Sequence, residues 1–313
     1  MVDLAVDMGR GLVLANPVMP ASGTFAEGLA KVVDLNGLGA LVTKTITAEL
    51  RGGNPVPRVS EVGNGMLNSI GIPSKGIDHF LDETLPFYRR FSSPLIVSIS
   101  APTVGEFARA AERLNVEGIA GIEANISCPN IEEDGKAFAM RPGTTEQAVS
   151  AMRKVTDLPL WAKLTPNTGD IAAVARAAEA AGADALVVAN TILAMSVDIE
   201  TMRPTLGNVM GGLSGPAVKP ITLRMTYQCA RAVDIPVIGC GGIASAEDAV
   251  EYLLAGARAV QVGTATFVKP GTMDEVIAGI AAYCRRKGFN RVVEMIGALN
   301  ADMLVPDVME AAQ

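Results

Sequence analysis

The chain has 313 residues, of which 49% are hydrophobic and 19% charged, and its formal net charge at pH 7 is −7. Acidic and basic residues are scattered along it, which argues against a nucleic-acid-binding or anionic-membrane surface, where basic residues gather. No apolar run reaches the roughly 20 residues of a membrane-spanning helix, and the first residues lack the apolar core of a signal peptide, so we expect a cytoplasmic protein without nucleic-acid or membrane partners.

Short apolar runs are the predicted strands, and longer segments with helical periodicity lie between them. In chain order the runs span residues 16–22, 40–46, 95–100, 121–127, 160–166, 185–191, 236–242 and 259–265. Helix starts are visible between the runs. TVGE at Thr103 and TTEQ at Thr144 have the capping-box spacing, and Ser245 is a good N-cap for the segment that follows it.

This alternation indicates parallel strands with helices on their outer side, and eight such strands favour a closed (β/α)8 TIM barrel. No linker or low-complexity segment divides the chain, so we expect one domain over residues 1–313, with loop insertions at the C-terminal face of the strands. A doubly wound open sheet is the alternative.

Active sites of such barrels form at the carboxyl ends of the strands. The polar and glycine residues predicted to lie there are Ser22, Lys44, Thr45, Ser98, Asn125, Cys128, Lys163, Asn190, Thr191, Gly241, Gly242, Gly263 and Thr264. Lysines and asparagines at strand ends of so apolar a chain indicate a functional site.

Two glycine turns, GCGGI after the seventh run and VGTA after the eighth, favour a bound phosphate. Glycine lets backbone N–H groups approach an anion closely, and the helix opened by Ser245 would add its positive end. The alternative is that each glycine only makes a tight turn. GCGGIA also fits a loose dinucleotide fingerprint, but its place near the end of a barrel argues against that reading.

Lys163 and Lys44 each allow several interpretations. Lys163 is a buried lysine paired with a carboxylate such as Glu123, a Schiff-base lysine, or a fixed positive charge beside a cofactor that becomes anionic on reduction. Asn68 lies in a long loop after the second run, and with three other asparagines it offers amides that suit a pyrimidine or imide edge. Those three are Asn125, Asn130 and Asn190.

None of the four cysteines forms a Cys-x-x-Cys pair, so zinc-ribbon and iron–sulfur spacings are absent. Cys229, Cys240 and Cys284 lie in apolar or helical surroundings and are expected to be buried, unreactive thiols. Cys128, in NISCPN, lies among polar neighbours. The only histidine, His79, is in an apolar helical stretch, so proton abstraction by Cys128 is more attractive than His-assisted nucleophilic attack.

Together these residues resemble the dihydroorotate dehydrogenases, most closely their class 1B form, over nearly the whole chain. The segments that carry the resemblance are GNPVPRV (53–59), GMLNSIGIPSKG (65–76), NISCPN (125–130), KLTPN (163–167), GGLSGPAVKPITLRM (211–225) and VIGCGGI (237–243). Any one of them is weak evidence, but the set is specific.

The resemblance implies one FMN at the barrel mouth and no metal site, with the FMN phosphate at Gly241, Gly242, Gly263 and Thr264. It implies further cofactor contacts from Ser22, Lys44, Thr45, Ser98, Asn125, Lys163, Ala189 and Gly215. Lys163 would stabilise negative charge on the reduced flavin. Orotate would be held by Lys44, Asn68, Ser69, Ile70, Gly71, Ile72, Asn125, Asn130, Asn190 and Thr191.

Cys128 would then be the general base that removes a proton from C5 of dihydroorotate while a hydride passes from C6 to the flavin. MLNSIGI and GGLSGPA resemble class 1B, which passes electrons to NAD through a partner subunit that carries FAD and a 2Fe–2S cluster. The family form implies a homodimer core joined by that subunit into a heterotetramer. Two departures are Ser98, where the family has asparagine, and the segment 131–145.

Other functions remain open. A class 1A-type enzyme would use fumarate in place of NAD, and an FMN-dependent dihydropyrimidine dehydrogenase would act on uracil or thymine. Lys44 discriminates against the latter, because its cation suits a substrate carboxylate that uracil lacks. A lyase with Lys163 as Schiff base would bind no flavin, and a phosphate-binding barrel without catalysis would leave Cys128 incidental.

Overall fold

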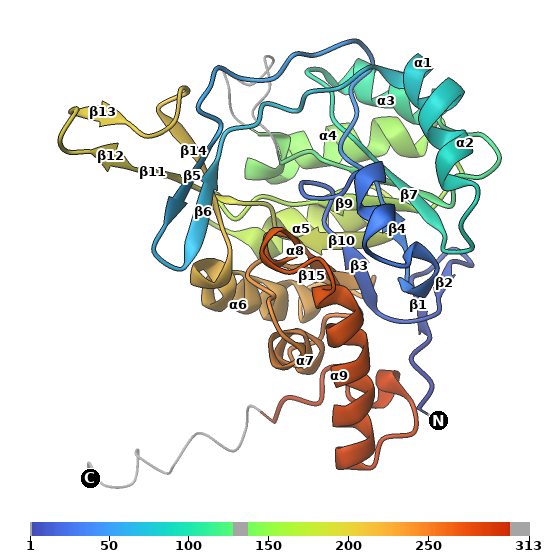
Figure 1. The fold of residues 1–313 in the computed structure, drawn as a ribbon. Coiled ribbons are helices and arrows are strands. Elements are labelled where there is room, and N and C mark those ends of the chain that lie inside the picture. The colour runs from blue at the N-terminus through green and yellow to red at the C-terminus, as the bar shows by residue number, and fades with distance from the viewer. Residues whose placement is uncertain (1, 128–136, 301–313) are drawn as a thin grey trace, which may run out of the picture.

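The computed structural model describes residues 2–127 and 137–300, and within them eight parallel strands form a nearly closed barrel (Figure 1). The strands hydrogen-bond in the order β3-β16-β15-β10-β9-β8-β7-β4. Their bounds are β3 (Val18–Pro20), β4 (Leu41–Val42), β7 (Leu95–Ile99), β8 (Gly121–Ala124), β9 (Leu160–Lys163), β10 (Ala185–Val188), β15 (Val237–Cys240) and β16 (Ala259–Val262). The predicted (β/α)8 barrel is therefore confirmed.

The barrel closes between β3 and β4 by a single close approach rather than by a ladder. The Gly39 N–H donates to the Val18 carbonyl over 2.8 Å. A Cβ at Gly39 would lie 2.0 Å from the Asn16 carbonyl oxygen, so only glycine allows the two segments this close.

Helices cover the outside of the barrel and bury its apolar strands (Figure 1). The longer ones are α3 (Val104–Arg113), α4 (Pro142–Arg153), α5 (Ile171–Ala180), α6 (Lys219–Ala230), α7 (Ala246–Leu254) and α9 (Thr272–Lys287). Shorter ones are α1 (Ile77–His79), the π-turn Phe80–Thr84, α2 (Leu85–Tyr88), α8 (Ala265–Val268) and the 3-10 turns Glu27–Lys31, Leu35–Gly37, Phe138–Met140, Pro216–Val218 and Val292–Glu294.

The helix caps confirm two of the three predicted helix starts. The Thr103 side chain accepts from the Glu106 N–H, and Ser245 forms a complete capping box with Asp248. The start at Thr144 was wrong, because α4 already begins at Pro142, whose fixed φ suits the first helical position. The Thr144 hydroxyl instead donates to the Phe138 carbonyl.

A four-stranded antiparallel sheet rises from the carboxyl ends of the barrel strands (Figure 1). Its order is β11 (Ile192–Met195), β14 (Met210–Ser214), β6 (Gly65–Asn68) and β5 (Val59–Val62). The hairpin of β12 (Val197–Asp198) and β13 (Arg203–Pro204) extends beyond it. The segment that contains Asn68, expected to be a loop, is thus partly a strand that pairs with β14.

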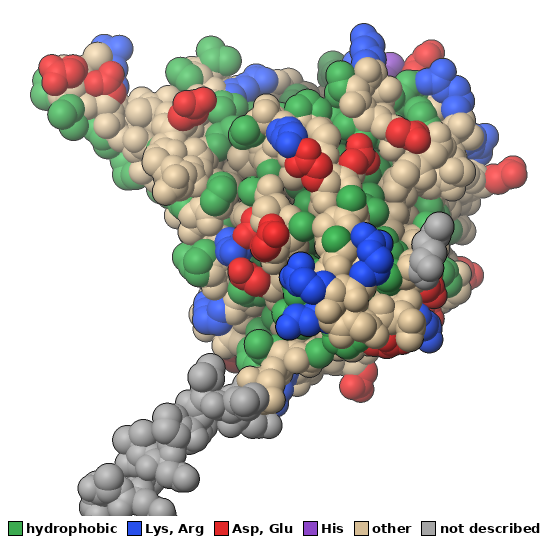
Figure 2. All heavy atoms as spheres, turned by 60° about the horizontal axis from the view of Figure 1, so that its bottom comes forward, with side chains coloured by type: hydrophobic (Ala, Val, Ile, Leu, Met, Phe, Trp, Pro, Cys, Tyr) green, Lys and Arg blue, Asp and Glu red, His purple; other side chains and the backbone are tan. Residues whose placement is uncertain are grey.

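The opposite end of the barrel carries the hairpin of β1 (Val6–Asp7) and β2 (Val13–Leu14). Arg10 in its turn donates to Asp184, the residue before β10, over 2.9 Å. Across the described ranges, no helix combines the length and apolarity that crossing a membrane requires. Figure 2 shows acidic and basic side chains interspersed on the face it presents, without a broad basic patch.

Candidate active site

A cavity of about 1340 Å³ opens between the carboxyl ends of the barrel strands and the antiparallel sheet. Eighteen of the predicted site residues line it: Ser22, Lys44, Thr45, Asn68, Ser69, Ile70, Gly71, Ile72, Asn125, Lys163, Ala189, Asn190, Thr191, Gly215, Gly241, Gly242, Gly263 and Thr264. Segments far apart in the sequence therefore meet at one mouth, as the barrel prediction required. Cys128 and Asn130 lie outside the described residues.

The two glycine turns form one side of the cavity. Gly241 has φ +137° and Gly242 has φ +70°, and a Cβ at Gly242 would lie 2.8 Å from the Lys219 nitrogen. Tyr252 holds the turn from outside by donating to the Gly241 carbonyl over 2.7 Å. Among the described residues, the N–H groups of both turns' inner positions (242, 243, 263 and 264) donate to no other group. Such N–H groups are the donors from which an anion-binding nest is built, and we call these two turns the glycine nest.

The positive end of α7 contributes less to this nest than its N-cap suggested. One oxygen of Asp248 accepts from the N–H groups of Ala244 (2.9 Å) and Ser245 (3.0 Å), so the helix supplies its own anion. Lys219 in turn donates to Asp248 over 2.7 Å. Burial alone would raise the pKa of Asp248, but the hydrogen bonds from Lys219 and Ala244 outweigh burial and lower this pKa.

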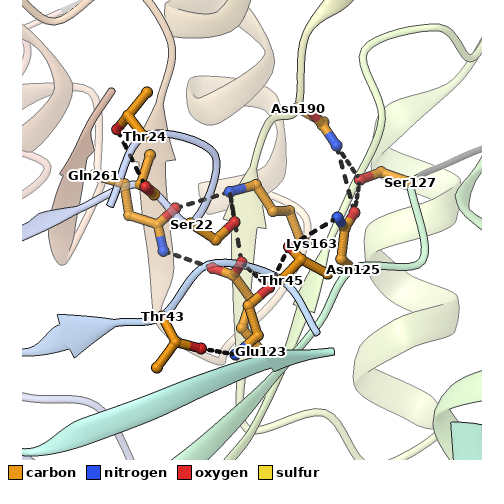
Figure 3. A network of polar contacts seen from close by, with 12 residues as sticks. Ser22, Thr24, Thr43, Thr45, Glu123, Asn125, Ser127, Lys163, Asn190 and Gln261 are labelled. Carbon is orange, nitrogen blue, oxygen red and sulfur yellow. Dashed lines mark hydrogen bonds and ion pairs between the residues drawn. The ribbon is translucent and has the colours of Figure 1, made fainter. Parts of the chain in front are cut away.

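Lys163 lies on the floor of the cavity and is only 4% exposed. Its ammonium donates to the Gln261 side-chain oxygen over 3.0 Å and lies 3.6 Å from a Glu123 carboxylate oxygen (Figure 3). The pairing with Glu123, one of the three interpretations of Lys163, is therefore present in the structure. Lys44, on the rim, donates to the Gly23 carbonyl over 3.1 Å.

Of the four amides predicted to converge, those of Asn68, Asn125 and Asn190 line the cavity, and Asn130 lies outside the described residues. Asn125 and Asn190 meet through Ser127, with 2.7 Å between Asn190 Nδ2 and Ser127 Oγ (Figure 3). Asn68 donates to the Gly212 carbonyl over 3.2 Å, which ties it to β14. Amide groups from three separate segments therefore line the same cavity.

Ser98 occupies a different place from the other predicted cofactor residues. It is completely buried, does not line the cavity, and lies beneath Thr45, at 2.9 Å between the two hydroxyl oxygens. Its hydroxyl donates to Glu123 over 3.0 Å. Ser98 therefore links Thr45 to Glu123 inside the barrel and does not contact the cavity.

Sequence reasoning missed some residues that shape the site. Asn167 donates to the Thr191 carbonyl (3.1 Å) and accepts from the Leu193 N–H (2.9 Å), which fixes the segment that carries Asn190. Ser127 and Gln261 were also missed. The sequence signals were present, since KLTPN and NISCPN contain two of the three residues, but their partners are remote in the chain.

The other described cysteines are confirmed as buried thiols. Burial raises the pKa of Cys229 to about 12. Burial likewise raises the pKa of Cys240, although nearby Lys163 opposes that rise. Neither thiol is therefore a ready nucleophile or base near neutral pH.

Comparison with known proteins agrees with this geometry. The family model described as "Dihydroorotate dehydrogenase" matches residues 5–283. Two similar proteins carry the name "Dihydroorotate dehydrogenase B (NAD(+)), catalytic subunit". The one from Thermoanaerobacter sp. (strain X514) is 48% identical, over 96% of this chain and 100% of the relative. The one from Desulforudis audaxviator (strain MP104C) is 50% identical, over 92% of this chain and 95% of the relative. Because both matches span nearly the whole chain, the protein belongs to the dihydroorotate dehydrogenase family.

Proposed function

We propose that this chain is the catalytic subunit of an NAD-linked dihydroorotate dehydrogenase, which oxidises (S)-dihydroorotate to orotate in pyrimidine synthesis. The observation that carries the proposal is that one cavity brings together the two glycine turns and the predicted lysines and asparagines, namely Lys44, Lys163, Asn68, Asn125 and Asn190. The names of the relatives agree with the reaction and with NAD as acceptor. These names favour the class 1B form over the fumarate-dependent class 1A form.

The cofactor we infer is FMN, and the residues present fit it. The nest of N–H groups at the glycine turns suits a phosphate, and the cavity extends from this nest to Lys163 and Asn125. Ser22, Thr45, Ala189 and Gly215 would line the remainder, while Ser98 would support Thr45 from below. Bound FMN would supply the hydride acceptor of the reaction.

The residues of the chain would bind and orient the substrate. Lys44, at the rim, suits the carboxylate of dihydroorotate, which uracil and thymine lack. Asn68, Asn125 and Asn190 suit the alternating N–H and C=O edge of its ring. Ser69 to Ile72 would close one side, and Thr191 and Asn130 would complete the set. This donor set favours dihydroorotate over dihydropyrimidines without a carboxylate.

We further propose that Cys128 is the general base that removes the C5 proton. Support comes from its place in NISCPN, directly after Ser127, which lines the cavity. Cys240 is the described thiol that lines the cavity, and burial raises its pKa, so Cys240 is poorly suited to act as the base. A general base of this kind contributes a factor of roughly 10²–10⁴ to the rate.

The partner we propose is an electron-transfer subunit. The relatives are named as catalytic subunits, which indicates a second chain in those enzymes. The family resemblance implies that this second chain carries FAD and a 2Fe–2S cluster and joins a homodimer core into a heterotetramer. The present chain has no Cys-x-x-Cys pair of its own to hold such a cluster.

The function is tested by anaerobic single-turnover reduction with dihydroorotate, followed in stopped flow. Cys128→Ala should retain FMN but reduce it roughly 10²–10⁴-fold more slowly. Cys229→Ala is the matched control, because it removes a buried thiol on α6 outside the cavity. Reduction of Cys128→Ala at the wild-type rate would remove Cys128 from the mechanism.

A further inference from the structure

A carboxylate is sealed in the centre of the barrel, where the proposed reaction gives it no part. Glu123 on β8 is 0% exposed, and its side chain points to the barrel interior beneath the cavity (Figure 3). Three donors face it: the Ser98 hydroxyl at 3.0 Å, the Gln261 amide nitrogen at 2.6 Å and the Lys163 ammonium at 3.6 Å. These donors reach both carboxylate oxygens, and burying the group at this depth without such partners would be very costly.

Gln261 can take only one orientation between its two charged neighbours. A carboxylate accepts hydrogen bonds and an ammonium donates them. The Gln261 nitrogen must therefore face Glu123, and its oxygen must face Lys163, as the distances of 2.6 and 3.0 Å show. Glu123 thus holds the ammonium of Lys163 twice, by direct attraction and through the amide it orients.

On its other side Glu123 directs a series of hydrogen bonds that leads to the cavity. Ser98 has one proton and gives it to Glu123, so Ser98 must accept the proton of Thr45, whose oxygen is 2.9 Å away. Thr45 has then used its only proton and must accept from Asn125, whose nitrogen lies 3.4 Å from Thr45 Oγ1. The direction of every step follows from the first acceptor, because a carboxylate has no proton to give.

The series of hydrogen bonds continues from Asn125 through Ser127 to Asn190. With its nitrogen turned to Thr45, Asn125 presents its oxygen to Ser127, which donates to it over 2.7 Å. Ser127 then accepts from the nitrogen of Asn190 over 2.7 Å. This leaves the oxygen of Asn190 for the Thr191 N–H, 2.8 Å away. The Thr191 N–H can only donate, so it orients Asn190 independently of Glu123, and the carboxylate at the barrel centre and this N–H impose the same direction on Asn125.

We propose that Glu123 is the positioning residue of this site. Its carboxylate fixes the Lys163 ammonium directly and through Gln261, and it sets the donor and acceptor directions of Thr45 and Asn125 through Ser98. The inference rests on the proposed function, in which Lys163 faces the flavin and the two asparagines face the substrate. Glu123 does not line the cavity, but it positions side chains that would contact the flavin and the substrate.

Two variants distinguish the contacts from Glu123 to Lys163 from the hydrogen bonds that lead from Glu123 to Asn125. Glu123→Gln keeps the size of the side chain but removes the charge, so it affects Lys163 and Asn125 together. Ser98→Ala interrupts only the series to Asn125, and it leaves Glu123, Gln261 and Lys163 in place. Two readouts other than turnover follow them: the midpoint potential of bound FMN, and the Kd of orotate from its perturbation of the oxidised flavin spectrum.

Glu123→Gln should leave the charge of Lys163 less compensated and favour reduced over oxidised FMN about tenfold, which raises the midpoint potential by about 30 mV. It should also weaken orotate binding about tenfold, because the direction of the Asn125 amide is no longer imposed from the barrel centre. Ser98→Ala should weaken orotate several-fold at an unchanged potential. These two patterns together would support the proposal.

A lower melting temperature of Glu123→Gln with unchanged potential and unchanged orotate Kd would overturn the proposal, because a merely structural carboxylate predicts that result. Should Glu123→Gln fail to fold, Ser98→Ala decides, and wild-type orotate affinity in that variant would overturn it. Reduction of the wild-type protein by dihydroorotate is measured first. Its absence would refute the proposed function itself and not the role of Glu123.

Discussion

Gly242→Ala is the substitution that most directly probes the glycine nest. Gly242 has φ +70°, a region that costs an L-residue roughly 1–2 kcal/mol. The new Cβ would lie 2.7 Å from Lys219 Cβ, 2.8 Å from the Lys219 nitrogen and 2.9 Å from the Gly215 oxygen. Two of these three are backbone atoms that cannot rotate away, so the turn itself must move.

The expected loss of affinity follows from the hydrogen bonds that the shifted turn no longer makes. Each N–H bond to a charged group contributes about 1.5–3 kcal/mol, so losing two weakens FMN by roughly 100-fold or more. The assay is fluorescence titration of apoprotein with FMN, because protein-bound and free flavin differ in emission. Folding is checked in parallel by circular dichroism and urea denaturation.

Gly182→Ala is the matched control for backbone strain. Gly182 also has positive φ, at +97°, and its Cβ would meet the Arg153 side chain, but it precedes β10 at the opposite end of the barrel. It should lower stability with an FMN Kd unchanged. If Gly242→Ala binds FMN within threefold of wild type, the glycine turns do not hold the phosphate.

Further predictions concern stability and its dependence on pH. Asp248→Ala should cost about 1 kcal/mol at pH 7 through loss of the α7 cap. Because the folded pKa of Asp248 lies below 3.8, its contribution is present above that value and is lost as the pH falls through the folded pKa. Urea titrations should therefore show the gap between wild type and variant shrinking from pH 5 to pH 3, and a constant gap would contradict the ion pair with Lys219. Asp184→Asn should lower the free energy of unfolding by about 2–3 kcal/mol, since Asp184 accepts from Arg10, Arg153 and the Leu160 N–H. Unfolding of this variant at the wild-type urea midpoint would show that these hydrogen bonds contribute nothing to stability. FMN affinity should be unchanged by Asp184→Asn, because Asp184 does not line the cavity.

Much of the fold was predictable because its signals are local. The apolar runs gave the barrel strands, and Thr103 and Ser245 marked helix starts by hydrogen bonds within one turn. Thr144 misled because a proline two residues earlier starts the helix first, and capping spacing carries no information about that competition. The β5–β6 hairpin of the antiparallel sheet did have a local signal, the turn residues Gly63 and Asn64 between its strands, and this signal was overlooked. The pairing of β6 with β14 could not be predicted in this way, because pairing across a long stretch of chain leaves no local pattern.

The candidate site shows the same division. Residues at strand ends were predicted to converge, and all of the described ones except the buried Ser98 line the cavity, because a parallel barrel brings the carboxyl ends of its strands to one face. The interior network was only partly foreseen. Lys163 and Glu123 could be paired from their types, but Gln261 is 138 residues from Glu123, and nothing local marks it as the group between them.

We propose above all that the protein binds FMN in this cavity and oxidises dihydroorotate there. The most direct test is the visible absorption spectrum of the purified protein, recorded anaerobically before and after dihydroorotate is added. We expect flavin bands that bleach with dihydroorotate and remain with dihydrouracil. A protein that stays colourless after FMN is supplied, or flavin bands that bleach only with dihydrouracil, would contradict this proposal.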